Sequence, residues 1–268
     1  MTDISTDIAV ENLIHEGERA DDTGFGRLRL IQKPEEFCYG VDAVILADFA
    51  ARSAAVSLPS RRRQQDAVTA VDLGTGTGII PLILSHKTQW QRLIGVEVQE
   101  GSYGRAVRNA RMNGLDERLR FIRGDVKDFG EGWGKDLAAS ADVVISNPPY
   151  TQGSGGLKSA NTAKAIARHE TTAGLEDFIR CAGWLLKPRG DFFMVHRPSR
   201  LVDICCMARK AGLEPKEMRF VSPDREAAAN ILLVHMVKGG GRQLTLLDPL
   251  CVYEKDGSYS EKIKECYR

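Results

Sequence analysis

Several features that would assign the chain to a class of protein are missing from its 268 residues. No run of about 18 apolar residues occurs, so we expect no membrane-spanning helix and no membrane partner. The six cysteines include no Cys-x-x-Cys pair and no Cys/His spacing typical of zinc sites, which predicts reduced thiols and no metal site. The polar, acidic first 22 residues lack the apolar core of a signal peptide, so we expect a cytoplasmic protein.

An excess of charge of one sign is also missing. Lysine and arginine total 37, and aspartate and glutamate total 36, giving a net charge of +1. This balance excludes a protein that coats nucleic acid through global positive charge, but it permits a local basic patch. Glycine, in contrast, is abundant: 26 of the 268 residues are glycine, about 10% against a usual share of about 7%.

Apolar strands alternate with helical segments from residue 67 onward, which predicts an α/β fold with helices on both faces of a sheet. We predict strands at residues 67–73, 92–98, 118–125, 142–147, 190–196, 218–223 and 230–238. The last two have no room for a helix between them, so they should form an antiparallel hairpin at the edge of an otherwise parallel, about seven-stranded sheet. Ligands of such sheets bind beyond the carboxyl ends of the strands.

The chain divides into three predicted segments. Residues 1–24 are a polar lead-in without clear period, which we expect to be flexible. Residues 25–240 form the α/β domain, headed by a small element with a strand at 25–32 and a helix at 40–51. Residues 241–268 form a C-terminal extension that packs on the domain and ends in a short helix.

Glycines gather where the first buried strand ends, in the run VDLGTGTG (71–78). Alternating glycines let the backbone turn tightly and approach a ligand closely. The spacing is neither the G-x-G-x-x-G of dinucleotide folds nor a phosphate loop, and the acid before the first glycine suits a cofactor that carries an ammonium group. A purely structural turn is the alternative interpretation.

Two more acids end the next two strands. Glu97, which ends the second strand, can accept hydrogen bonds from both hydroxyls of a ribose, and Asp125 at the end of the third can accept from an adenine amine. For a single such acid, the alternative interpretation is a solvent-exposed side chain that binds no ligand. Three acids at three successive strand ends favour an adenosine-containing cofactor.

The fourth strand ends in Asn147-Pro148-Pro149-Tyr150, the sharpest signal in the chain. The Asn147 side-chain oxygen and the Pro148 carbonyl are acceptors that can hold a planar –NH₂ group with its lone pair turned toward an incoming methyl. Tyr150 offers a ring on which a base can stack, which is worth about 1–3 kcal/mol. A rigid loop that merely ends the strand explains the prolines, but neither the asparagine nor the tyrosine.

These motifs resemble the class I S-adenosylmethionine-dependent methyltransferases that methylate amines. VDLGTGTG, Glu97, Asp125 and NPPY match that family in order and spacing. Three further stretches resemble the bacterial tRNA methyltransferases that modify the adenine 6-amino group just 3′ of the anticodon of a valine tRNA. They are FCYGVDAVILADFA (37–50), the segment 147–170 with its Arg168-His169-Glu170, and NILLVHMVKGG (230–240).

The resemblance implies a Rossmann-like class I methyltransferase fold, S-adenosylmethionine as cofactor and tRNA as partner, with no DNA substrate and with the chain a monomer or homodimer. Its implied cofactor residues are Asp72, Gly74, Gly76 and Gly78 for the methionine part, Glu97 for the ribose, Asp125 and Val126 for the adenine, Tyr39, Gly40 and Asp42 near the methionyl group, and Asn147. Its implied catalytic residues are Asn147, Pro148, Pro149 and Tyr150. We predict that Tyr150, Lys158, Lys164, Arg168 and Arg197 bind the RNA, and that the basic residues converge with Arg200, Lys238 and Arg242 into one basic rim.

Rival functions remain open at this point. NPPY is shared by enzymes that act on adenine, guanine or glutamine amides, so the substrate could be another planar amine in ribosomal RNA or a protein. A non-catalytic protein that binds S-adenosylmethionine is the alternative from a different class. His169 and Glu170 could act together as a general base for proton transfer, although a helix-surface or loop-anchoring role is the stronger interpretation. Displacement at a methyl group needs no general base.

Overall fold

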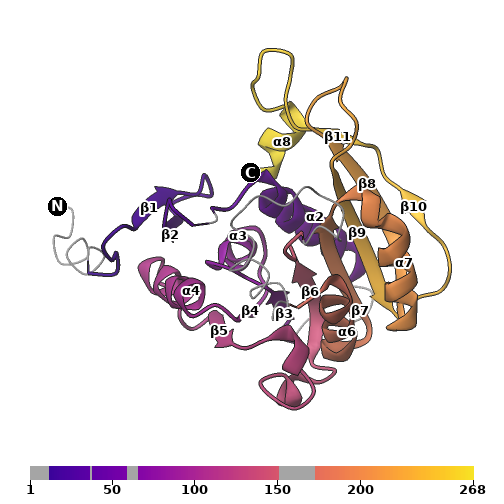
Figure 1. Ribbon diagram of the computed structural model, residues 1–268, viewed down its shortest axis with the longest axis horizontal. Helices are drawn as coiled ribbons and strands as arrows, with labels where there is room; N and C mark the ends of the chain where they lie inside the picture. Colours follow the sequence, from indigo (N-terminus) through magenta and orange to yellow (C-terminus); the bar gives the residue numbers. More distant parts are fainter. Residues whose placement is uncertain (1–11, 37, 59–65, 151–172) are drawn as a thin grey trace, which may run out of the picture.

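The computed structural model describes residues 12–36, 38–58, 66–150 and 173–268, and its centre is one sheet with helices on both faces (Figure 1). The strands of this sheet are β3 (Thr69–Leu73), β4 (Arg92–Glu97), β5 (Leu119–Arg123), β6 (Ala141–Ser146), β7 (Leu186–His196), β8 (Leu213–Ser222), β9 (Ile231–Lys238), β10 (Thr245–Leu246) and β11 (Leu250–Cys251). Their order is β10-β8-β9-β7-β6-β3-β4-β5, with β11 also on β8. β9 alone runs against its neighbours β7 and β8.

This topology confirms the predicted fold, a mostly parallel sheet of seven main strands in which the last two pair as a hairpin. One detail of the prediction is wrong. The hairpin does not form the outer edge, because β10 and β11 of the C-terminal extension pair in parallel with the free side of β8. β7 and β8 also begin earlier than predicted, at Leu186 and Leu213, since bulges near Val143 and Pro215 let their first residues rejoin the ladder.

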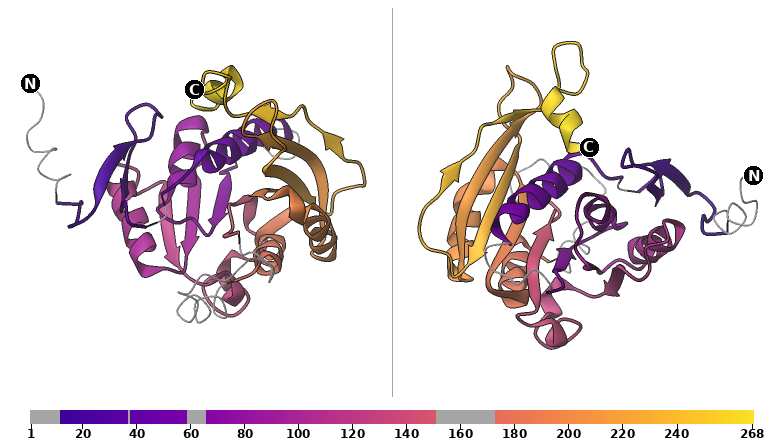
Figure 2. Two further views of the ribbon diagram at one scale, coloured as in Figure 1. Left: turned by 45° about the horizontal axis from the view of Figure 1, so that its top comes forward. Right: turned by 180° about the vertical axis from the view of Figure 1, so that it is seen from behind.

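The helices divide between the two faces of the sheet (Figure 2). They are α2 (Val41–Ser57), α3 (Ile79–Lys87), α4 (Glu100–Met112), α6 (Leu175–Leu185), α7 (Leu201–Lys210) and α8 (Glu261–Cys266), with 3₁₀ turns η1 (Val126–Asp128), η2 (Lys135–Leu137) and η3 (Pro198–Arg200). Alternating strand residues serve the two faces, as the period of two requires: Ala70 packs toward α2 and α3, and Val71 toward α6 and α7.

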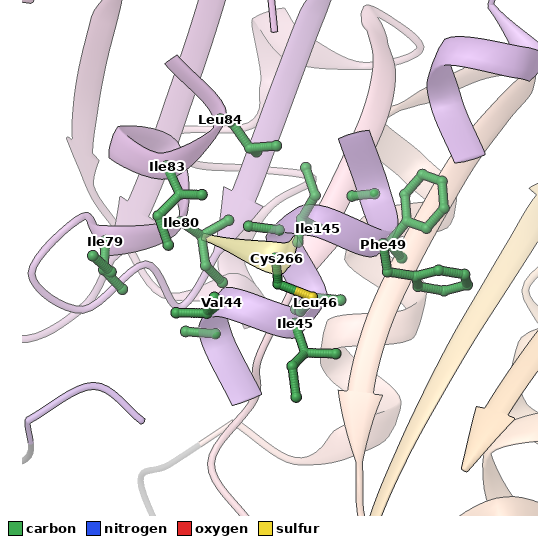
Figure 3. Packing of buried hydrophobic residues seen from close by; sticks show 14 of the residues in the cluster. Val44, Ile45, Leu46, Phe49, Ile79, Ile80, Ile83, Leu84, Ile145 and Cys266 are labelled. Atoms are coloured by element: carbon green, nitrogen blue, oxygen red, sulfur yellow. The ribbon is translucent and has the colours of Figure 1, made fainter. Parts of the chain in front are cut away.

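Helix α2 is buried along most of its length because other elements surround it. Figure 3 shows Val44 and Phe49 of α2 in one cluster with Ile83 of α3, Ile145 of β6 and Cys266 of α8. A helix enclosed in this way reads as apolar all round, without a single stripe. The packing fixes the first turn of α2 at the carboxyl edge of the sheet, next to the end of β6.

A separate two-stranded sheet, β1 (Arg19–Asp22) and β2 (Arg29–Gln32), precedes α2. The end of the lead-in predicted at residues 1–24 therefore forms a strand, β1, and the strand predicted at 25–32 begins only at Arg29. β1 shows no apolar alternation and none of its residues is buried, whereas β2 buries Leu30 and Ile31 and is also bonded to two polar side chains at the end of α4. Asn109 and Asn113, one helical turn apart, bond the backbones of Ile31 and Arg29, respectively.

We expect Asn109→Ala to lower the free energy of unfolding by about 1–3 kcal/mol. The Asn109 side chain is fully buried, accepts from the Ile31 N–H at 2.6 Å and donates to the Thr77 carbonyl at 2.9 Å, so its loss leaves buried groups unpaired. Urea denaturation measures the change. Asn113→Ala is the matched control, and its smaller effect follows because water can replace its more exposed bonds. Equal losses for the two variants would contradict this account.

Candidate functional site

The glycine turn between β3 and α3 has the backbone that its sequence predicts. Gly74, Gly76 and Gly78 have φ values of +71°, +58° and +84°, a left-handed region that favours glycine. A Cβ on Gly78 would lie 2.8 Å from the Phe121 ring, whereas a Cβ on Gly76 would meet nothing within 4 Å. Gly78 is therefore required by packing, and the space over Gly76 is open to a ligand.

Asp72, the acid before this turn, is buried in an unusual state. Neither carboxylate oxygen has a hydrogen-bond partner among the described residues, and the same holds for the hydroxyl of Thr75. Burial raises the pKa of Asp72 to about 7, although Thr75 nearby lowers it, and the Glu97 carboxylate adds to the rise. Such an uncompensated carboxylate is expensive unless a donor or cation reaches it. The arrangement therefore fits a positively charged ligand group.

Glu97, at the end of β4, ties the glycine turn to the neighbouring strand. One carboxylate oxygen accepts from the Gly76 N–H at 2.9 Å, and the other accepts from the Gln99 N–H at 2.8 Å. The side chain is buried, which raises its pKa, so the solvent-exposed alternative does not hold. Each carboxylate oxygen can accept a second hydrogen bond, as a ribose hydroxyl would require.

Asp125 and Val126 lie at the end of β5, in the third position along this edge. The Asp125 side chain caps η1 by accepting from the Lys127 N–H at 2.9 Å, and Val126 is buried. The Trp133 indole donates to the Asp125 carbonyl at 2.7 Å, and its ring fills the space beside Gly124. The segment 129–141 thus folds back under this part of the site, a role that no local pattern had indicated.

Asn147 follows β6 and contacts the first turn of α2. Its side-chain N–H donates to an Asp42 carboxylate oxygen at 3.3 Å. The Tyr150 hydroxyl lies 3.2 Å from the same Asp42 oxygen and 3.1 Å from the Asn147 side-chain oxygen. The structure therefore brings Asp42, Asn147 and Tyr150 into one triangle, a contact between residues 105 positions apart that sequence reasoning missed.

The ring of Tyr150 contacts two residues at the end of β7. His196 meets it edge-on at 5.1 Å between ring centroids, and the Arg197 guanidinium lies 4.7 Å from its centroid. Burial, helped by Arg200 and Arg197, lowers the pKa of His196 to about 4, and burial with Asp42 raises the pKa of Tyr150. Both side chains are therefore uncharged at neutral pH.

The predicted basic rim is wrong for Lys238 and Arg242. Because β9 is antiparallel, its carboxyl end lies at the opposite edge of the sheet, where Lys238 donates to the Leu186 carbonyl at the start of β7. Arg242 lies near Glu214 at the start of β8. Arg197 does lie at the site edge, where it donates to the Asn230 carbonyl. The predicted RNA contacts Lys158, Lys164 and Arg168, like His169 and Glu170, lie outside the described residues.

Known proteins are similar to this chain in sequence and in fold. The family described as methyltransferase small domain matches residues 46–203. A Porphyromonas gingivalis (strain W83) protein named tRNA1(Val) (adenine(37)-N6)-methyltransferase is 30% identical over 167 residues, which are 62% of this chain and 60% of that protein. An Actinobacillus pleuropneumoniae serotype 7 protein of the same name is 27% identical over 200 residues, 73% of this chain and 78% of that protein.

A solved structure shares the fold. The crystal structure of a predicted O-methyltransferase from Agrobacterium tumefaciens superposes with a TM-score of 0.63 at 20% identity, covering 84% of this chain and 95% of that one. Among the residues that the structure describes, no helix has the length and apolar character needed to cross a membrane.

Proposed function

Because the chain belongs to the methyltransferase small domain family, whose methyl donor is S-adenosylmethionine, we propose that it methylates the 6-amino group of an adenine in tRNA. The adenine is the one just 3′ of the anticodon, as in the tRNA1(Val) enzymes that the chain resembles. The observation that carries the proposal is the Asn147 amide, which lies after the end of β6, beside the strand β3 that contains Asp72. Because β3 and β6 pair in parallel, an amine bound by Asn147 would lie next to the cofactor turn.

The residues at the first three strand ends fit the cofactor. The Asp72 carboxylate, which has no hydrogen-bond partner in the described part of the chain, suits its ammonium group, and the open space over Gly76 admits its methionine part. Glu97 has acceptor capacity for the ribose, while Asp125 and Val126 would border the adenine. Tyr39 and Gly40 lead directly into α2 on the same side. When bound, S-adenosylmethionine supplies an electrophilic methyl group.

The residues after β6 would hold the target amine. The Asn147 side-chain oxygen and the Pro148 carbonyl would accept hydrogen bonds from the two N–H groups of the amine, so that its lone pair points toward the methyl carbon. An amine held in this way would be placed to take the methyl group from the sulfur of the cofactor, and its surplus proton would pass to water. Catalysis therefore rests on position and on acceptors placed in advance.

An anticodon loop is a suitable source of such a base. Its nucleotides are unpaired, so an adenine can leave the stack at little cost and enter the site. Tyr150 would stack on it, with Arg197 on the ring supplying positive charge for the adjoining phosphate. Lys158, Lys164 and Arg168 remain predicted RNA contacts. We propose tRNA as the partner and the cytoplasm as the place of action.

A substrate competition tests this function against its rivals. Purified protein and labelled cofactor are offered total tRNA, ribosomal RNA and protein extract from a strain that lacks the gene. We expect label in tRNA as N6-methyladenosine. Label in ribosomal guanine or in a protein glutamine amide would replace the proposed substrate with that amine, and no label in any pool would refute a methyltransferase of amines.

A further inference from the structure

The triangle of Asp42, Asn147 and Tyr150 carries one inference beyond amine binding itself. We infer that Asp42 is a positioning residue for methyl transfer, which fixes the side-chain amide of Asn147 with its oxygen facing the amine. The inference rests on the proposed function, since it concerns the same acceptor oxygen. It assigns Asp42 to the substrate side of the site, whereas the family resemblance places it near the methionyl group of the cofactor.

The reasoning starts from the chemistry of the two side chains. An asparagine amide has one end that donates and one that accepts, and the two ends have nearly the same shape. A carboxylate oxygen only accepts, so Asp42 selects the orientation in which the Asn147 N–H groups face it, at 3.3 Å. The Asn147 oxygen, at the other end of the amide, is thereby left to accept from a donor.

Tyr150 shows that this oxygen is available to a donor. Its hydroxyl lies 3.1 Å from the Asn147 oxygen, in hydrogen-bond range. The pKa of Tyr150 is raised, so the hydroxyl keeps its proton and can donate it. The amide oxygen has a second lone pair, which remains for an amine N–H. Asp42, at 3.2 Å, offers the same hydroxyl a second acceptor.

The position of Asp42 is itself rigid. It lies in the first turn of α2, where one carboxylate oxygen accepts from the Ala43 N–H at 2.9 Å, leaving the other for Asn147 and Tyr150. The next turns of α2 are buried against α3 and β7. The packed helix therefore holds Asp42 in a fixed place from which it can orient the Asn147 amide, as a positioning residue requires.

Kinetics of Asp42 variants test the inference. We expect Asp42→Ala to lower kcat roughly 10- to 100-fold while KM for the RNA and Kd for the cofactor stay within about 3-fold, because Asp42 orients an acceptor and binds neither ligand. Asp42→Asn, which keeps an acceptor oxygen but can also donate, should restore part of kcat. Glu261→Ala is the matched control: it removes the exposed first-turn acid of α8 and should leave both constants unchanged.

Two outcomes would overturn the inference. One is a wild-type kcat in Asp42→Ala. The other is a loss of cofactor affinity with kcat intact, which would return Asp42 to the cofactor. The assay uses whichever planar amine the wild-type protein methylates, so failure on tRNA adenine refutes the proposed function without deciding the role of Asp42.

A readout without turnover is the side-chain NH₂ signal of Asn147 in ¹⁵N spectra, assigned through Asn147→Ala. Its hydrogens should exchange faster in Asp42→Ala, and unchanged exchange would contradict the inference.

Discussion

Asn147→Ala should abolish methyl transfer while the protein still folds and binds its cofactor. The variant removes the side-chain oxygen that accepts from the target amine, and such a prepositioned polar group is typically worth about 100- to 1,000-fold in kcat. Cofactor affinity should change little, because Asp72 and Glu97 are on other strands and keep their surroundings. Transfer of labelled methyl groups gives kcat, and calorimetry gives Kd.

Asn113→Ala is the matched control for this variant. It removes the asparagine that directly follows α4 and bonds the Arg29 backbone, well outside the site, and its activity should equal that of the wild type. Turnover of Asn147→Ala at the wild-type rate would show that the amide does not hold the amine. A loss of activity that tracks a loss of folded protein, read by circular dichroism, would assign Asn147 a structural role instead.

Asp72→Asn should move stability and cofactor binding in opposite directions. The Asp72 carboxyl has a pKa of about 7 in the folded protein against about 3.9 in an unfolded chain, so the folded state holds the proton more tightly. The free energy of unfolding therefore falls as the pH rises from about 4 to about 7, and the loss is complete above that range. Three pKa units correspond to up to about 4 kcal/mol. Asparagine, neutral and of the same shape, removes this penalty.

The ligand-free variant should accordingly unfold at a higher temperature than the wild type at pH 8, and the difference should shrink toward pH 4. Its affinity for S-adenosylmethionine should be at least about 10-fold weaker, since an amide cannot neutralise an ammonium group. In the wild type, affinity should rise with pH through about 7. Asp116→Asn, at an exposed surface ion pair, is the control and should change neither property. Lower stability of Asp72→Asn at pH 8 would contradict the account.

Local sequence patterns predicted the parts of the molecule that local forces determine. Buried parallel strands such as β3 and β6 are short continuous apolar runs, and the glycine turn needs left-handed backbone that few other residues adopt. Those patterns predicted that Asp72, Glu97, Asp125 and the NPPY motif lie at strand ends. The structure then places these ends along one edge of the sheet, because β3 to β7 run parallel.

Features that depend on distant partners were missed. β1 has no apolar face and no period marks it, because it is placed by pairing with β2, which carries the buried residues of this small sheet. Lys238 lies at the edge opposite to the predicted one, because β9 runs antiparallel and its carboxyl end is therefore at the other edge of the sheet. Asp42 and Asn147 meet only because α2 packs beside β6, and a contact across 105 residues leaves no trace in spacing.

The most direct test of the central claim is methylation of two transcripts of a valine tRNA. One has adenine just 3′ of the anticodon, and the other has guanine at that position alone. The account predicts that the wild-type protein methylates the first transcript to about one methyl group per molecule, recovered as N6-methyladenosine, and leaves the second unmodified. Equal methylation of the two transcripts, or none of the first when it is offered with S-adenosylmethionine, would contradict it.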